Sequence, residues 1–200
     1  MNKLFLAGGI GVALIGALTG GFAAGRWSAP DEREQYILRR AWVLTEQAQR
    51  TPQGGALLIG DSLTERSGFQ TLCGLPVFNA GVSMARLSDM VEAGPELARS
   101  LQPELTMVAL GTNDARRGMS LAAWREEMDR LLGNLPRPLI VVSLPAMQAE
   151  AAPFNAALVE LADKHGAVLV PPIAYETSDG LHQSPAGAVT WREAVAESCR

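Results

Sequence analysis

The sequence is poor in residues that bind metal ions or phosphate groups. It has two cysteines and two histidines among 200 residues, and no cluster of His, Cys and carboxylate residues has the spacing of a metal site. A glycine-rich phosphate loop is missing too, because Gly54-Gly55 precedes a predicted strand and does not open a helix. We therefore expect no metal ion and no cofactor.

Clustered positive charge is missing as well. Lys and Arg number 17 against 21 Asp and Glu, which gives a formal net charge of −4 at pH 7. Nucleic-acid phosphates are bound by clustered Lys and Arg, so we expect no nucleic-acid partner. The content of 48% hydrophobic and 19% charged residues is that of a globular protein. A length of 200 residues suits a single domain with a sizeable core.

Charge is absent altogether from residues 4–25. This run is long enough for a membrane span, which needs about 20 apolar residues. Small residues at 21–25 could also form the cleavage site of a signal peptide. We favour an uncleaved transmembrane anchor, with a cleaved signal peptide as the alternative. Both interpretations place the rest of the chain outside the cytoplasm, in the periplasm if it stays anchored or secreted if it is cleaved.

The two cysteines fit such a compartment, because disulfides persist in oxidising surroundings. A bond between Cys73 and Cys199 could form there. Two free thiols agree with the sequence about as well, since spacing alone does not determine pairing.

We divide the chain into three parts. Residues 1–25 form the anchor or signal peptide, 26–54 an amphipathic helix and linker beside the membrane, and 55–200 the folded domain. In the second part, Ile37, Ala41 and Leu44 recur at helical spacing, which predicts a helix over about 31–50. Proline and glycine in 51–55 end this helix.

From residue 56 onward, apolar stretches alternate with helical patterns. Strands are predicted at 56–60, 76–80, 105–110, 138–144 and 167–170. Helices are predicted at 63–72, 86–100, 120–133, 153–165 and 185–198. This alternation is typical of an α/β fold, in which helices cover both faces of a parallel sheet.

Polar residues and glycines follow the first three predicted strands. Ligands bind beyond the carboxyl ends of the strands in open parallel sheets, so we expect these residues to meet at one edge. Acyl transfer needs a nucleophile, a base, a group that orients the base, and donors for the oxyanion. The chain offers Ser62, His182, Asp179 and, as donors, the Gly81 backbone N–H and the Asn113 side chain.

Four short blocks in this order resemble the SGNH, or GDSL-type, hydrolase family. The serine block is Gly60-Asp61-Ser62-Leu63-Thr64, and the glycine block is Phe78-Asn79-Ala80-Gly81-Val82-Ser83. The asparagine block is Leu110-Gly111-Thr112-Asn113-Asp114, and the last block is Ser178-Asp179-Gly180-Leu181-His182. The resemblance covers about residues 55–198.

The resemblance implies a three-layer α/β sandwich with a five-stranded, flavodoxin-like parallel sheet. It makes Ser62 the nucleophile, His182 the base and Asp179 its partner. It assigns the oxyanion hole to the backbone N–H groups of Ser62 and Gly81 and to the side chain of Asn113. In one departure, Met84 stands in the region where many members carry another glycine.

The resemblance further implies a serine esterase that works through an acyl-enzyme. Short connections between the blocks suggest an open cleft, so we expect small acyl groups, such as acetyl esters on carbohydrate. The alternatives are a lysophospholipase or thioesterase, and an acyltransferase acting on a cell-envelope polysaccharide.

Other conspicuous residues receive structural interpretations. Asp61 is expected to cap or tie its turn, Asp114 to be structural, and His165 to sit at a helix end where a cation suits the dipole. We interpret Trp42, Trp124 and Trp191 as packing residues, since all three lie on helical patterns.

Overall fold

The computed structural model describes residues 31–146 and 148–199. The predicted anchor or signal peptide at 1–25 therefore lies outside the described residues. Within the described part, no helix combines the length and apolar character needed to cross a bilayer. Glu32–Arg200 forms one compact unit, and the description below concerns this unit.

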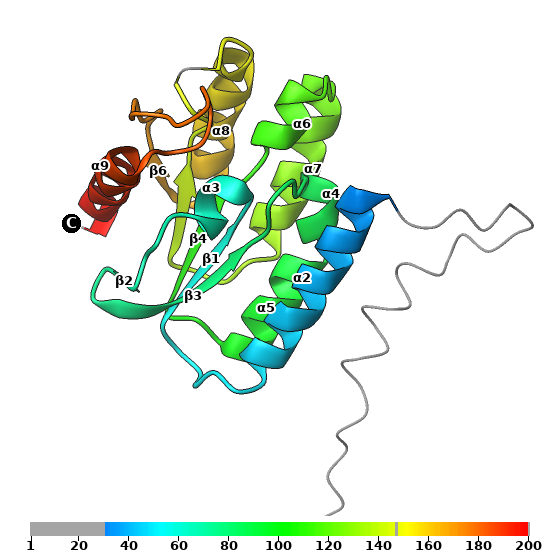
Figure 1. Ribbon diagram of the computed structural model, residues 1–200, viewed down its shortest axis with the longest axis vertical. Coiled ribbons are helices and arrows are strands. Elements are labelled where there is room, and N and C mark those ends of the chain that lie inside the picture. Colours follow the sequence, from blue (N-terminus) through cyan, green and yellow to red (C-terminus); the bar gives the residue numbers. More distant parts are fainter. Residues whose placement is uncertain (1–30, 147, 200) are drawn as a thin grey trace, which may run out of the picture. The chain divides into compact units, whose positions relative to one another are not determined.

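A six-stranded sheet forms the centre of the unit, in the order β2-β3-β1-β4-β5-β6 (Figure 1). All neighbouring pairs are parallel except β2 and β3. The parallel strands thus follow the flavodoxin-like order, as predicted. The sixth strand, β2, is a short antiparallel addition that the sequence did not indicate. The bounds are β1 Ala56–Gly60, β2 Thr71–Leu72, β3 Leu75–Gly81, β4 Leu105–Ala109, β5 Leu139–Val142 and β6 Val168–Val170.

The helices follow the predicted pattern with three differences. The helix predicted at 63–72 ends at Glu65, and the chain turns through Gly68 at a φ of 69° before β2 begins. The helix predicted at 86–100 is divided in two, because Pro95 has no N–H to continue a helix across that point. A short helix after β4 was not predicted. The bounds are α2 Glu32–Ala48, α3 Ser62–Glu65, α4 Leu87–Met90, α5 Ala93–Leu101, α6 Thr112–Arg116, α7 Leu121–Gly133, α8 Ala151–His165, α9 Pro185–Ala196 and the 3-10 helix η1 Glu197–Cys199.

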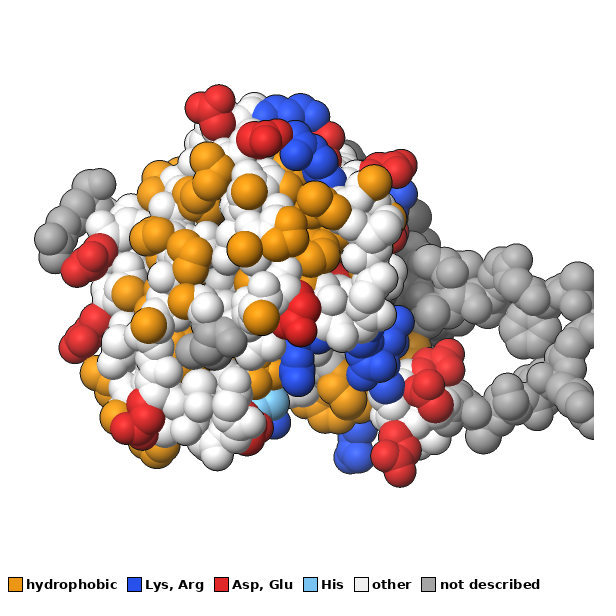
Figure 2. Space-filling view, turned by 90° about the horizontal axis from the view of Figure 1, so that it is seen from above, with side chains coloured by type: hydrophobic (Ala, Val, Ile, Leu, Met, Phe, Trp, Pro, Cys, Tyr) orange, Lys and Arg blue, Asp and Glu red, His pale blue; other side chains and the backbone are white. Residues whose placement is uncertain are grey.

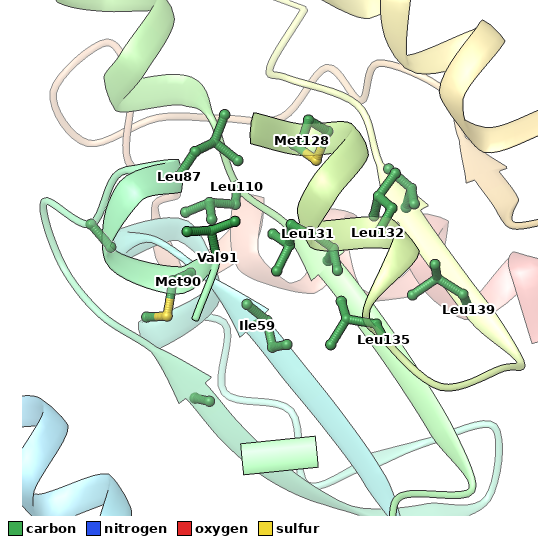
Figure 3. Close-up of a cluster of buried hydrophobic side chains, with 14 of the residues drawn as sticks. Ile59, Leu87, Met90, Val91, Leu110, Met128, Leu131, Leu132, Leu135 and Leu139 are labelled. Atoms are coloured by element: carbon green, nitrogen blue, oxygen red, sulfur yellow. The ribbon is translucent and has the colours of Figure 1, made fainter. Parts of the chain in front are cut away.

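Alternate residues of each central strand point to opposite faces of the sheet. Leu57 and Ile59 of β1 belong to a large apolar cluster with side chains from α2, α4, α5, α7 and α8 (Figure 3). Ala56 and Leu58 belong to a second, smaller cluster, to which Trp191 of α9 contributes. Both faces of the central strands are therefore buried, which explains their continuous apolar sequence.

Helix α2 is part of the folded unit. Its Leu44 and Ala48 are buried in the larger cluster, whereas Trp42 is 66% exposed. The prediction of Trp42 as a packing residue was therefore wrong. The sequence division placed this helix outside the domain at 55–200, while the compact unit in the structure begins at Glu32.

A disulfide joins Cys73 and Cys199. Cys73 lies in the turn between β2 and β3, and Cys199 ends η1, so the bond ties the edge of the sheet to the C-terminal region. The sequence left this pairing open.

Candidate active site

Ser62 begins α3, immediately after the carboxyl end of β1. The Oδ1 of Asp61 accepts a hydrogen bond from the backbone N–H of Leu63 at 3.0 Å, which caps the helix as predicted. Because Gly60 pairs with Gly81, the end of β3 lies beside the nucleophile candidate. The local sequence thus places the Ser62 hydroxyl at the edge of the sheet.

Ser62, His182 and Asp179 form a continuous hydrogen-bonded chain. The Oγ of Ser62 lies 2.9 Å from Nε2 of His182, and Nδ1 of His182 lies 2.6 Å from Oδ2 of Asp179. An ionised carboxylate accepts hydrogen bonds only, so Nδ1 of His182 carries the hydrogen in this pair and Nε2 can accept the Ser62 proton. The structure therefore brings together the three side chains that the sequence selected.

The loop before α9 holds both Asp179 and His182 in position. Oδ1 of Asp179 accepts the backbone N–H groups of Leu181 at 3.0 Å and His182 at 2.8 Å. The side-chain hydrogen bond from His182 and these two backbone bonds hold the pKa of Asp179 well below its usual range. Asp179 consequently remains ionised at neutral pH and can stabilise a positive charge on the imidazole.

Asn113 lies in α6, just beyond the end of β4. One hydrogen of its side-chain amide is donated to the carbonyl oxygen of Ala85, with Nδ2 and O 2.9 Å apart. An amide group has two hydrogens, so this bond orients the side chain and leaves the second hydrogen for another acceptor.

Gly81 lies at the end of β3. Its backbone N–H is donated to Oδ1 of Asn79, at 2.9 Å, so it would have to share or leave this partner to bind an oxyanion. A Cβ at this position would come within 2.2 Å of the backbone nitrogen of Glu65. Glycine is therefore required here for close packing of β3 against α3, and the role of Gly81 as an oxyanion donor stays a prediction.

Two further carboxylates are buried near the strand ends. Burial, assisted by the negative charge of Asp114, raises the pKa of Asp61 to about 7 against the hydrogen bond from Leu63. Burial also raises the pKa of Asp114 to about 6, although Asp114 accepts the backbone N–H of Leu87. Both serve as helix or turn anchors, which agrees with their structural interpretation.

The second histidine is remote from Ser62 in sequence and has a different set of partners. His165 ends α8, and its Nε2 lies 2.6 Å from Oδ1 of Asp129. Its Nδ1 lies 3.3 Å from a guanidinium nitrogen of Arg137. Both ring nitrogens are therefore engaged.

A small pocket is lined by residues of α3, α6 and α9, and Ser62, His182 and Asn113 are not among its lining residues. Leu63, Thr112 and Tyr175 contribute to its lining, together with Ser143 and Trp191. The space open to the centre of a water molecule is about 10 Å³, which is enough for about one water molecule. Figure 2 views the molecule from above, and hydrophobic side chains gather across the middle of this face.

Glu65 is a residue of this region that the sequence did not single out. It lies three positions after Ser62 and contacts Tyr36 and Ser83. These partners are 29 and 18 positions away, so no local pattern indicates them.

The hydrogen-bonded serine, histidine and aspartate on an α/β fold are the arrangement of a serine hydrolase. Comparison with family models identifies residues 58–189 with the GDSL-like lipase/acylhydrolase family. The chain belongs to this family. Comparison with curated protein sequences gave no match.

Several solved structures share the fold at low sequence identity. A protein from Streptococcus pneumonia, provisionally described as a platelet activating factor, is 19% identical with a TM-score of 0.67, covering 84% of this chain and 96% of the other. A catalytic mutant of Axe2, an acetylxylan esterase from Geobacillus stearothermophilus, is 17% identical with a TM-score of 0.60, covering 74% and 95%. The psychrotrophic esterase EstA from Pseudoalteromonas sp. is 16% identical with a TM-score of 0.59, covering 73% and 96%.

Proposed function

We propose that the protein hydrolyses carboxylic esters through an acyl-enzyme on Ser62. His182 takes the hydroxyl proton at Nε2 as Oγ attacks the ester carbonyl, and then gives it to the leaving alkoxide. Water attacks the acyl-enzyme in the second half of the reaction, with His182 again as the base. The observation that carries this proposal is the hydrogen-bonded chain from Ser62 through His182 to Asp179.

Two donors are proposed for the oxyanion of the tetrahedral intermediate. The backbone N–H of Ser62 opens α3, where an N–H has no partner within the helix. The second amide hydrogen of Asn113 is the other donor, because the first is fixed on Ala85. Such donors stabilise negative charge that develops only during the reaction.

Short acyl groups, such as acetyl, are the proposed substrates, carried on carbohydrate or another small alcohol. Short connections between the four blocks favour an open cleft, which suits small acyl groups. The acetylxylan esterase among the similar structures supports the same class of substrate.

Ser62→Ala tests the chemistry, and a series of acyl lengths tests the substrate. We expect Ser62→Ala to lower kcat/KM on an aryl acetate by at least about 10⁴-fold. Wild-type kcat/KM should be highest for acetyl and fall toward palmitoyl esters. An unchanged rate in Ser62→Ala would overturn the assignment of Ser62 as the nucleophile. A maximum at long chains would favour a lysophospholipase, and acylation of added sugar in excess of hydrolysis would favour an acyltransferase.

An extracytoplasmic location is also proposed. The disulfide between Cys73 and Cys199 suits an oxidising compartment, and the uncharged run at 4–25 remains a predicted anchor or signal peptide. Protease treatment of cells whose outer membrane has been opened tests this location, because a periplasmic domain is then cleaved and a cytoplasmic one is protected. The mass of the mature N-terminus distinguishes anchor from signal peptide.

A further inference from the structure

The segment 82–85 connects the two sides of the candidate site. At one end, the backbone N–H of Val82 is donated to the carbonyl of Gly60, at 3.0 Å, two residues before Ser62. At the other end, the carbonyl of Ala85 accepts the side chain of Asn113. The position of this segment therefore affects both the surroundings of the nucleophile and the orientation of a proposed oxyanion donor.

The segment contains an unfavourable backbone conformation. Met84 has a φ of 65°, in the left-handed region that residues with a side chain rarely adopt. Such a conformation is unfavourable and persists only where the surrounding contacts hold it. The sequence has methionine here where a glycine would adopt the conformation freely, so the contacts at this point matter more than they would for glycine.

Glu65 holds the middle of the segment from the nucleophile's own helix. Its Oε2 accepts the backbone N–H of Ser83 at 2.6 Å and also the hydroxyl of Ser83. Burial would raise the pKa of Glu65, but hydrogen bonds from Ser83 and Tyr36 and the charge of Arg40 outweigh it and lower this pKa. Glu65 is therefore ionised, and hydrogen bonds to an ionised acceptor are the stronger kind.

Helix α2 holds Glu65 in place and also contacts the segment directly. The hydroxyl of Tyr36 is donated to Oε1 of Glu65 at 2.7 Å, and Nε of Arg40 lies 3.4 Å from the same oxygen. Arg33 donates from Nε to the carbonyl of Met84 at 3.2 Å and forms an ion pair with Asp89.

We propose that α2 is a positioning element of the active site, which acts through Arg33 and through Tyr36 and Glu65 to hold the strained 82–85 segment beside Ser62. This inference rests on the proposed esterase function. It assigns a positioning role at the active site to α2, a helix that the sequence analysis placed only beside a membrane. Tyr36 is a positioning residue, since its hydroxyl is donated to the side chain of Glu65 and acts on the site through that residue.

Tyr36→Phe and Glu65→Gln in the full-length protein test the proposal. Both keep the size of the side chain and weaken the hold on Ser83. We expect kcat on an aryl acetate to fall about 10-fold in Tyr36→Phe and further in Glu65→Gln, with KM within twofold of wild type. Binding of an alkyl boronic acid, which mimics the tetrahedral intermediate, should weaken by the same factor as kcat. Amide hydrogen exchange in a peptide spanning 82–85 should accelerate in both variants.

Arg39→Ala is the matched control, because Arg39 lies on the same helix and is exposed. It should leave kcat, boronic acid binding and exchange at 82–85 unchanged. A purely structural role would lower the melting temperature of the variants while the folded fraction kept wild-type kcat and boronic acid binding, and this result would overturn the proposal. Unaltered exchange at 82–85 in Glu65→Gln would overturn it too. An inactive wild type would instead overturn the proposed function, and the exchange result would still show whether α2 holds the segment.

Discussion

The chain contains two histidine–aspartate pairs that share one nitrogen–oxygen distance and differ in the ring nitrogen involved and in their surroundings. His182 with Asp179 and His165 with Asp129 each have a nitrogen–oxygen distance of 2.6 Å. In the first pair the carboxylate holds Nδ1, and Nε2 faces the hydroxyl of Ser62. In the second pair the carboxylate holds Nε2, and Arg137 lies at Nδ1.

The difference shows that an imidazole beside a carboxylate is not by itself a catalytic unit. The ring can transfer a proton only through a nitrogen that the carboxylate leaves available. Because the guanidinium group of Arg137 can only donate, Nδ1 of His165 accepts and Nε2 donates to Asp129. His165 therefore closes a structural contact at the end of α8, whereas His182 has one nitrogen left for chemistry.

The largest expected effect separates the two histidines. His182→Ala should lower kcat/KM on an aryl acetate by about 10⁴-fold or more, because the serine proton loses its acceptor. His165→Ala should retain kcat/KM within about threefold, since that ring contacts no part of the Ser62 site. Steady-state kinetics on purified, folded variants measure both. Equal losses in the two variants would remove the distinction between the pairs.

The next effect separates the two carboxylates that orient these rings. Asp179→Asn keeps the side-chain size but no longer selects the productive tautomer of His182, so kcat should fall about 10²–10⁴-fold. Asp129→Asn should change kcat less than twofold. A full kcat profile over pH 5–9 for each variant provides the measurement. Wild-type kcat in Asp179→Asn would mean that Asp179 has no part in the reaction.

A smaller effect concerns Asp61, the buried carboxylate that directly precedes Ser62. Burial raises the pKa of Asp61 to about 7, so its ionisation opposes folding. This penalty is absent below the ordinary pKa of a carboxyl group, grows as the pH rises, and is complete above about pH 7. Asp61→Asn, which can still accept from Leu63, should raise the unfolding free energy by on the order of 2 kcal/mol at pH 8. Urea unfolding should show much less gain at pH 5, and a larger gain at pH 5 than at pH 8 would contradict the assignment.

The smallest effect concerns the stability of the second pair. Hydrogen bonds from Lys164 and His165 lower the pKa of Asp129, so this stabilisation is present above the ordinary pKa of a carboxyl group and is lost as the pH falls through the lowered value. The Asp129 side chain is 33% exposed, which limits the contribution to about 0.5 kcal/mol. Asp129→Asn should therefore unfold at a slightly lower urea concentration than wild type at pH 7, and the difference between their urea midpoints should be smaller at pH 3. A larger difference at pH 3 would show that the ionised Asp129 is not the source of this stabilisation.

Local patterns predicted most of the fold and the core of the site. The strands could be predicted from their continuous apolar sequence, because both faces of the sheet are covered. Asp179 and His182 could be predicted because a spacing of three residues brings them together in one turn. The hydrogen bond from the Gly81 N–H to Asn79 could not be predicted, since it depends on the orientation of the Asn79 side chain within β3. The contact of Tyr36 with Glu65 could not be predicted either, because it joins two helices that only the folded core brings together.

Labelling with a fluorophosphonate tests the central claim most directly, because the reagent requires an activated serine. In wild type and in His165→Ala, the added mass should appear on the tryptic peptide 51–66 and localise to Ser62, at the same rate. In His182→Ala, the rate should fall at least about 10³-fold. Labelling at another residue, or a wild-type rate in His182→Ala, would contradict the account of Ser62 as a nucleophile activated by His182.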